Sequence, residues 1–368
     1  MKILLSTPIF EMAGGGAENF AFRLSRALSD RGHDMHVVTD RGGPVPGISV
    51  YHGIAQMNGV LEDVCPDLFI DWGFNHPADL HRLGGGAHQS FLEHSLNAYH
   101  GPLRWYKGLR NRAPKHRAVI RRQAEMLRRP ESFFLANSRF AADQVVAAGA
   151  RPEAVGVLHN GVDTGMFRPA KGKEAADRLR ARWGLKPSDV AVLFVAHNLL
   201  LKNFALLRDL FRELASKSPK MKLIVVGKRK PSFMPPNSVY AGELSDMVSC
   251  YQAADCLAHP TFFDSCANVV LEAMSTGLPV VASNVCGAHE LVEEGQSGFV
   301  LTVTGKKKRE IRDQWLKTLQ VLGGDEVLRR RMGAGGREAM VRNDFGVYVT
   351  RLEGFMKQVL EDKKGHDQ

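Results

Sequence analysis

The sequence predicts an α/β protein of two doubly wound domains, in which parallel strands alternate with helices. Short apolar runs alternate with segments whose apolar residues recur at helical spacing, and glycines stand between them. The length of 368 residues suits two hydrophobic cores rather than one. The composition excludes a disordered chain, because 44% of the residues are hydrophobic and no segment is of low complexity.

The cysteines and the opening residues indicate the compartment. The five cysteines form no CxxC pair and no disulfide-dense pattern (Cys65, Cys250, Cys256, Cys266, Cys286), so we interpret them as buried thiols in a reducing cytosol. The opening run MKILLSTPIFE is too short for a signal peptide. No window approaches the ~18 uninterrupted apolar residues of a membrane span. These observations predict a cytoplasmic protein.

The expected elements repeat in two series. Strands are expected at 2–8, 35–39, 67–73 and 132–138, with helices at 17–28 and 139–149. After a turn-rich, charged connection at 162–188, strands at 190–197, 222–227 and 255–260 alternate with helices at 203–216 and 247–254. We therefore expect an N-terminal domain at 1–165, a C-terminal domain at 166–345, and a helix at 346–368 that can pack back on the N-terminal domain. A ligand would bind in a cleft between the domains, at the carboxyl ends of their strands.

Two features near strand ends could bind phosphate. The loop GGGAENF leads into a helix, so backbone N–H groups near Gly15 and Gly16 could hold a phosphate, although an ordinary glycine turn explains it equally well. The spacing of these glycines is not GxGxxG, and Asp40 is only a weak candidate for the acid that binds the ribose of a dinucleotide. Both observations count against an NAD-binding fold. Lys202 follows a strand and starts a helix, where its charge could neutralise a diphosphate or simply face solvent.

The third feature is the segment HPTFFDSCANVVLEAMSTGLPVVAS at 259–283. Ser265 or a neighbour is expected to cap a helix over 266–276, leaving the N–H groups of Ala267 and Asn268 available to a phosphate. Asp264 and Glu272 are eight residues apart, so they cannot hold the same atom. We interpret them as binding opposite ends of an elongated ligand such as a nucleotide-sugar, with sugar hydroxyls at Asp264 and ribose hydroxyls at Glu272.

The net charge of +10 is concentrated in residues 104–129, which hold ten Lys/Arg and one acid, Glu125, beside Trp105 and Tyr106. A solvated helical face is the plain explanation. The density also suits an anionic surface. Because no nucleic-acid module accompanies it, we favour a membrane surface or an acidic lipid-linked substrate and expect no nucleic acid as a partner.

Several motifs in order resemble family 4 retaining glycosyltransferases of the GT-B fold. They are GGAENFAFRLSRALSDRGHDMHVVT, ANSRFAADQV, HNGVDTGMFRP and YQAADCLAHPTFFDSCANVVLEAMSTGLPVVASNVCGAHELVEEGQSGFVL. The resemblance covers nearly the whole chain and implies two Rossmann-like domains facing each other across a cleft. VCGAH, HRLGGGAHQSFL and the basic segment are similar to bacterial lipopolysaccharide core glucosyltransferases. Those enzymes move glucose from UDP-glucose to an inner-core heptose at the cytoplasmic face of the inner membrane, which implies a peripheral location there.

The resemblance also implies roles for individual residues. Glu272 would bind the donor ribose, Asp264 the transferred sugar and Lys202 the diphosphate. The remaining donor-binding positions would be Gly15, Gly16, Ala267, Asn268 and Val269. His88 would contact the sugar or act near the reaction centre, although a lone histidine in a glycine-rich segment is often only a structural hydrogen bonder.

Three departures from the family pattern bear on the sugar. Asp264 stands where the family has a glutamate, Ser265, Cys266 and Ala267 replace the usual glycines, and His197 or uncharged residues replace an arginine that often precedes Lys202. The implied mechanism is a front-face transfer in which Lys202 and helix N-termini stabilise the leaving diphosphate, so no metal is expected. The histidines at 76, 81, 88 and 94 lack the HExxH spacing.

Two other function classes remain open from the sequence. One is a nucleotide-sugar 2-epimerase of similar two-domain shape, which would release product without an acceptor. The other is a non-catalytic module that binds an anionic surface through residues 104–129. The two acids together with Lys202 speak against the second.

Overall fold

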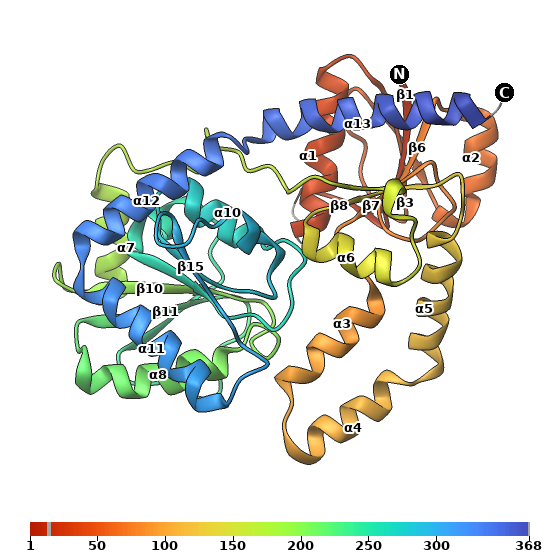
Figure 1. Ribbon diagram of the computed structural model, residues 1–368. Helices are drawn as coiled ribbons and strands as arrows, with labels where there is room; N and C mark the ends of the chain where they lie inside the picture. The colour runs from red at the N-terminus through yellow and green to blue at the C-terminus, as the bar shows by residue number, and fades with distance from the viewer. Residues whose placement is uncertain (13–15, 367–368) are drawn as a thin grey trace. The chain divides into compact units, whose positions relative to one another are not determined.

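The computed structural model of the protein describes residues 1–12 and 16–366 (Figure 1). The chain forms two compact units. Unit one contains Met1–Phe91, Asn111–Gly161 and the C-terminal residues from Gly346, and unit two contains Leu92–Arg110 and Val162–Phe345. Among the described helices, none combines the length and apolar character that crossing a bilayer requires.

Unit one is built on a parallel sheet of seven strands. Their spatial order is β5 (Ile48–His52), β3 (Asp34–Thr39), β1 (Lys2–Ser6), β6 (Leu68–Asp71), β7 (Leu80–Leu83), β8 (Phe133–Ala136) and β9 (Val155–Val157). A separate pair joins β2 (Ile9–Phe10) to β4 (Arg41–Gly42). The helices of the unit are α1 (Gly16–Asp30), α2 (Met57–Val64), α5 (Pro114–Leu127), α6 (Arg139–Ala147) and nearly all of α13 (Phe345–His366). Arg31 at the end of α1 donates to Glu353 of α13 over 2.7 Å, which ties the last helix to this unit.

Unit two is built on a parallel sheet of six strands. Their order is β12 (Ser238–Gly242), β11 (Met221–Val226), β10 (Val190–Val195), β13 (Cys256–His259), β14 (Val280–Ser283) and β15 (Gly298–Leu301). Its helices are α4 (Gly101–Asn111), α7 (Glu174–Arg182), α8 (Phe204–Lys217), α9 (Met247–Ala253), α10 (Asn268–Ser275), α11 (Lys308–Gly324) and α12 (Glu326–Val341), and α3 (His88–Ser95) belongs partly to each unit. The central strands are apolar and buried on both faces, as parallel strands covered by helices must be.

Both sheets have Rossmann-like order, which confirms the expected fold class. In each, the chain starts at a central strand, winds outward in one direction, then returns to the centre and winds outward in the other. The reversal falls between β1 and β6 in unit one and between β10 and β13 in unit two. Ligands of open α/β sheets bind outside the carboxyl ends of the strands at such a switch point.

The strands expected from apolar runs are all present, and among the strands that the sequence analysis does not predict, β7 shows why. β7 carries His81 and Arg82, whose polarity conceals a buried strand. His81 is stacked between the rings of Phe74 and Phe134. Arg82 donates to Asn160 over 2.5 Å. These contacts bury two side chains that local sequence alone places at the surface.

The contact between α12 and the turn after α10 generates a stability prediction. A Cβ at Gly333 would lie 1.9 Å from the carbonyl oxygen of Gly277. Overpacking of this kind costs about 1–3 kcal/mol. We expect Gly333→Ala to lower the midpoint of thermal unfolding by several degrees. Gly324→Ala is the matched control, because nothing lies within 4 Å of that position, and an equal loss in both variants would contradict the close approach.

Candidate functional site

The loops that follow β10 and β13 converge at the switch point of unit two. The two strands pair in parallel through Val192 with Cys256 and Leu193 with Leu257. Beyond the strands, the N–H of Phe262 donates to the carbonyl oxygen of Leu201 over 2.9 Å. Side chains on the two loops are therefore held next to one another.

Lys202 is fixed by the loop after β10. Asn198 accepts the N–H of Leu201 on its side chain over 3.1 Å and the N–H of Lys202 on its carbonyl over 3.0 Å. Asn203 then adopts a left-handed conformation with φ of 58° and starts α8. The Nζ atom of Lys202 contacts Oδ2 of Asp264, and the two side chains are 18% and 20% exposed. The structure thus brings together two of the residues that the sequence singles out.

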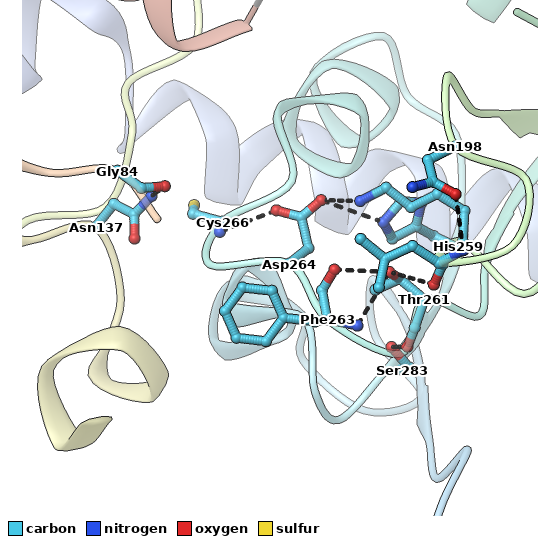
Figure 2. Close-up of polar contacts among 11 residues, drawn as sticks. Gly84, Asn137, Asn198, His259, Thr261, Phe263, Asp264, Cys266 and Ser283 are labelled. Carbon is cyan, nitrogen blue, oxygen red and sulfur yellow. Dashed lines mark hydrogen bonds and ion pairs between the residues drawn. The ribbon is translucent and has the colours of Figure 1, made fainter. Parts of the chain in front are cut away.

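Asp264 is fixed by a neighbouring loop as well as by its own turn (Figure 2). Its N–H donates to Val285 over 3.1 Å and its carbonyl oxygen accepts from Gly287 over 2.8 Å. Its Oδ1 accepts the N–H of Cys266 over 3.2 Å. Backbone and carboxylate are held independently, so the direction of the side chain is set before any ligand binds.

The charges of this pair are set by two opposed effects. Burial alone would raise the pKa of Asp264, but the ammonium group of Lys202 and the imidazole of His259 together outweigh it and hold the pKa below its ordinary value. His259 ends β13, is 1% exposed and places Nε2 3.8 Å from Oδ2 of Asp264. Burial lowers the pKa of His259. At neutral pH the carboxylate is therefore ionised and the imidazole neutral.

The helix after Asp264 differs from the expectation. The expected helix over 266–276 is present as α10, but it covers Asn268–Ser275 and its N-cap is Ala267, a neighbour of Ser265 that makes no side-chain capping bond. The residues before it form a turn in which Asp264 accepts the N–H of Cys266. Ala267 itself is buried, at 4% exposure. Asn268 and Val269 form the first two positions of the helix.

Glu272 has a buried partner that the sequence reasoning missed. The hydroxyl of Tyr251, on α9, donates to Oε2 of Glu272 over 2.6 Å. Tyr251 is 0% exposed, and its ring meets that of Phe167 edge-on at 6.0 Å. Burial, followed by the Glu272 carboxylate, raises the pKa of Tyr251. The signal was weak, because a tyrosine or histidine inside an apolar run is most often part of the core; His259 was missed for the same reason.

The remaining expected residues belong to unit one. Gly15 lies outside the described residues, and Gly16 is the first residue of α1. His88 starts α3, and its Nε2 lies 3.0 Å from Nδ1 of His116 on α5. Burial, and then His116, lower the pKa of His88. This contact joins the glycine-rich segment HRLGGGAHQSFL to the basic segment at 104–129.

A second polar cluster lies at the carboxyl ends of β1 and β6, beside the start of β7. Ser6 donates to Asp71, and the other carboxylate oxygen of Asp71 lies 3.5 Å from Nδ1 of His81. All three side chains are 0% exposed. Asp71 also accepts the N–H of Asn75 over 2.8 Å, so we interpret the cluster as the anchor of the loop after β6.

The Lys202–Asp264 contact generates a pH-dependent prediction. The pKa of Asp264 is lower folded than unfolded, so its contribution is present above the ordinary value and is lost as pH falls toward the folded value. Asp264→Asn should therefore lower the thermal unfolding midpoint at pH 7, and the difference from wild type should shrink below about pH 4. Asp313→Asn, with a carboxylate 53% exposed, is the control and should change the midpoint little at any pH. A difference for Asp264→Asn that stays constant down to pH 3 would contradict the assignment.

The part of the chain that contains these residues is similar to known proteins. The family model described as "Glycosyl transferases group 1" matches residues 190–320, which include Lys202, His259, Asp264 and Glu272. A D-inositol 3-phosphate glycosyltransferase of Streptomyces bingchenggensis is 32% identical over 228 residues, covering 55% of this chain and 47% of the relative. The enzyme of that name from Corynebacterium efficiens is 29% identical over 235 residues, covering 59% and 54%. The chain thus spans about half the length of the curated relatives it matches.

Solved structures agree with the fold over almost the whole chain. WaaG, a glycosyltransferase involved in lipopolysaccharide biosynthesis, superposes with a TM-score of 0.77 at 16% identity, covering 96% of this chain and 99% of WaaG. HepE of Anabaena, solved with UDP-glucose, gives 0.74 at 19% identity, covering 97% and 100%. The matched family model and the relatives named above are those of glycosyltransferases. Residues 190–320 match the glycosyl transferases group 1 model, and the chain has the GT-B fold of two Rossmann-like sheets.

Proposed function

We propose that the protein is a retaining glycosyltransferase that moves glucose from UDP-glucose to a lipopolysaccharide core or another lipid-linked, cell-envelope glycan. The observation that carries the proposal is the pairing of Lys202 with Asp264 at the switch point of a glycosyl transferases group 1 domain. A cation and an ionised acid at that edge provide one group for a diphosphate and one for sugar hydroxyls.

The donor would lie along the carboxyl edge of the sheet in unit two. In this proposal Lys202 binds the diphosphate, Asp264 the hexose and Glu272 the ribose. Ala267, Asn268 and Val269 around the start of α10 would bind the diphosphate as well, and the resemblance implies the same role for Gly15 and Gly16. The dipole of α10 favours negative charge at its N-terminus, where no side chain caps it.

Transfer would proceed on one face of the sugar. The bond between the anomeric carbon and the diphosphate oxygen breaks as the acceptor oxygen bonds to the same face of that carbon, and the acceptor proton passes to the leaving oxygen. Lys202 and the N-terminus of α10 would stabilise the charge that develops there without a metal ion. His88, paired with His116, is the candidate on the acceptor side.

The identity of donor and acceptor rests on named relatives. HepE was solved with UDP-glucose, WaaG is described as acting in lipopolysaccharide biosynthesis, and the curated relatives are named for inositol 3-phosphate. The similarity of VCGAH and the basic segment to lipopolysaccharide core enzymes favours the glucose and core assignments over the inositol phosphate one.

Substitution of the donor residues tests the proposal. In an assay that follows UDP-glucose with a core-glycan acceptor, Lys202→Ala should reduce kcat by about 100-fold or more, because one preorganised charge-stabilising donor is lost. Glu272→Ala should raise the donor KM by at least about tenfold. Lys217→Ala is the matched control, since that lysine is 57% exposed on the neighbouring α8 and pairs with Glu213.

Three outcomes of this experiment would contradict the proposal. Near wild-type turnover by Lys202→Ala would exclude its role, and loss of turnover in EDTA would exclude metal independence. Conversion of UDP-GlcNAc in the absence of acceptor would assign the chain to the epimerases instead.

A thermal-shift panel of UDP-, GDP- and ADP-sugars selects the donor first, because a ligand at 100 times its Kd stabilises by about 2.7 kcal/mol.

We further propose that α4 places the enzyme on an anionic membrane surface, at the inner face of the cytoplasmic membrane. The helix buries none of its residues. Leu103, Trp105, Tyr106 and Leu109 are 67%, 70%, 55% and 45% exposed, and they alternate with Arg104, Lys107 and Arg110. Exposed aromatic and aliphatic side chains among cations are typical of helices that lie in the interface of an anionic bilayer. α5 continues the basic segment with Lys115, Arg117, Arg121 and Arg122.

Vesicle sedimentation tests the surface. The protein should sediment with phosphatidylglycerol-containing vesicles and not with phosphatidylcholine alone, and less so as salt rises. Each cation near an anionic surface contributes about 1 kcal/mol, so Arg104→Glu with Arg110→Glu should weaken binding at least tenfold. Arg330→Glu with Arg331→Glu on α12 makes the same change in charge and should have little effect. Equal sedimentation with both kinds of vesicle at low salt would refute the proposal.

A further inference from the structure

In the proposed function Lys202 has two alternative partners, the carboxylate of Asp264 and the diphosphate of the donor. In the structure its Nζ atom contacts Oδ2 of Asp264. In the proposed reaction the same ammonium group binds the diphosphate. A cation drawn toward a diphosphate leaves Asp264 with one hydrogen bond to its carboxylate from the chain's own turn, the N–H of Cys266 at 3.2 Å. An ionised carboxylate that is four-fifths buried is costly without a further partner.

His259 is placed to supply that partner. It lies at the end of β13, five residues before Asp264, and is 1% exposed. Neither of its ring nitrogens has a hydrogen-bond partner, although both are buried. Nε2 lies 3.8 Å from Oδ2, the oxygen that Lys202 contacts, and an approach of about 1 Å would make a hydrogen bond.

The backbone at and after His259 is held in place, which limits any movement of its side chain to a small shift. The strand register fixes His259 opposite Ala282 of β14. Beyond it, Thr261 is held by the hydroxyl of Ser283, which donates to its carbonyl oxygen over 2.7 Å (Figure 2). A buried polar side chain that is held in place yet unpartnered requires an explanation.

We propose that His259 is a positioning residue that replaces Lys202 as the hydrogen-bond partner of Asp264 when a diphosphate draws Lys202 away. This inference rests on the proposed function for the identity of the ligand. The neutral imidazole donates its Nε2–H to Oδ2, so Asp264 stays ionised and keeps its direction toward the sugar while Lys202 moves. His259 itself touches neither the donor nor the acceptor.

Three substitutions separate this role from simple packing. Glutamine can place an amide nitrogen where Nε2 lies, asparagine carries its amide at the position of Nδ1, and leucine has no donor. We expect His259→Leu and His259→Asn to lose about 10- to 100-fold in kcat/KM, as for a lost hydrogen bond to a charged group, and His259→Gln to stay within about fivefold of wild type. Equal losses in the glutamine and asparagine variants, or near wild-type activity in His259→Leu, would overturn the proposal. In an Asp264→Asn background, His259→Leu should add less than about twofold, and a full additional loss would show that His259 acts elsewhere.

A second arm needs no donor and so distinguishes failure of this inference from failure of the proposed function. In a Lys202→Met variant Asp264 has lost its cation, and His259 should already be its partner. His259→Leu should then lower the thermal unfolding midpoint by at least about 3 °C more in the Lys202→Met background than in wild type. An equal effect in both backgrounds would overturn the inference. If the coupling is found but no UDP-sugar is turned over, the exchange of partners stands and the proposed function fails.

Discussion

The parallel pairing of β10 with β13 is the constraint on which the candidate site depends. The two strands are neighbours in space but lie more than sixty residues apart in the chain, and helices leave them in opposite directions across the sheet. Their outgoing loops must therefore meet, and the bond from Phe262 to Leu201 joins them. Lys202 and Asp264 come together because of this topology.

Each acid of the candidate site lies next to a buried side chain, a tyrosine in one case and a histidine in the other. Tyr251 contacts Glu272 directly, and His259 stands 3.8 Å behind Asp264. The two supports differ in kind. The tyrosine already makes a charge-assisted hydrogen bond and has no reason to move. The histidine makes no hydrogen bond while Lys202 contacts the carboxylate oxygen, so the proposed exchange of partners concerns the Asp264 end of the site.

The sequence predicts the frame of the molecule better than its details. Apolar runs between glycines are sufficient to identify the central strands, because strands buried on both faces must be continuously apolar. They are insufficient for β7, since His81 and Arg82 are buried through partners distant in sequence. The start of α10 also differs from the local expectation, because Asp264 accepts the N–H of Cys266 in a turn and the helix begins two residues later.

The site residues divide in the same way. Lys202, Asp264 and Glu272 are found from charge placed at strand and helix ends, and the family match covers all three. Tyr251 and His259 are not found, because a polar tip on an apolar segment acquires meaning only when its neighbour in space is known. His88 was singled out as an isolated histidine, yet the structure pairs it with His116.

The backbone pairing of Asp264 with residues 285–287 has an evolutionary consequence. Two hydrogen bonds to residues 285–287 fix the backbone position of Asp264. How far its carboxylate extends therefore depends on the sequence of that loop as well as on residue 264 itself. An aspartate here and a glutamate in a homologue can then place a carboxylate at the same point, if a difference in the loop at 285–287 offsets the difference in side-chain length. In the proposed function, donor preference would then depend on both segments, so comparing position 264 alone between homologues would mislead.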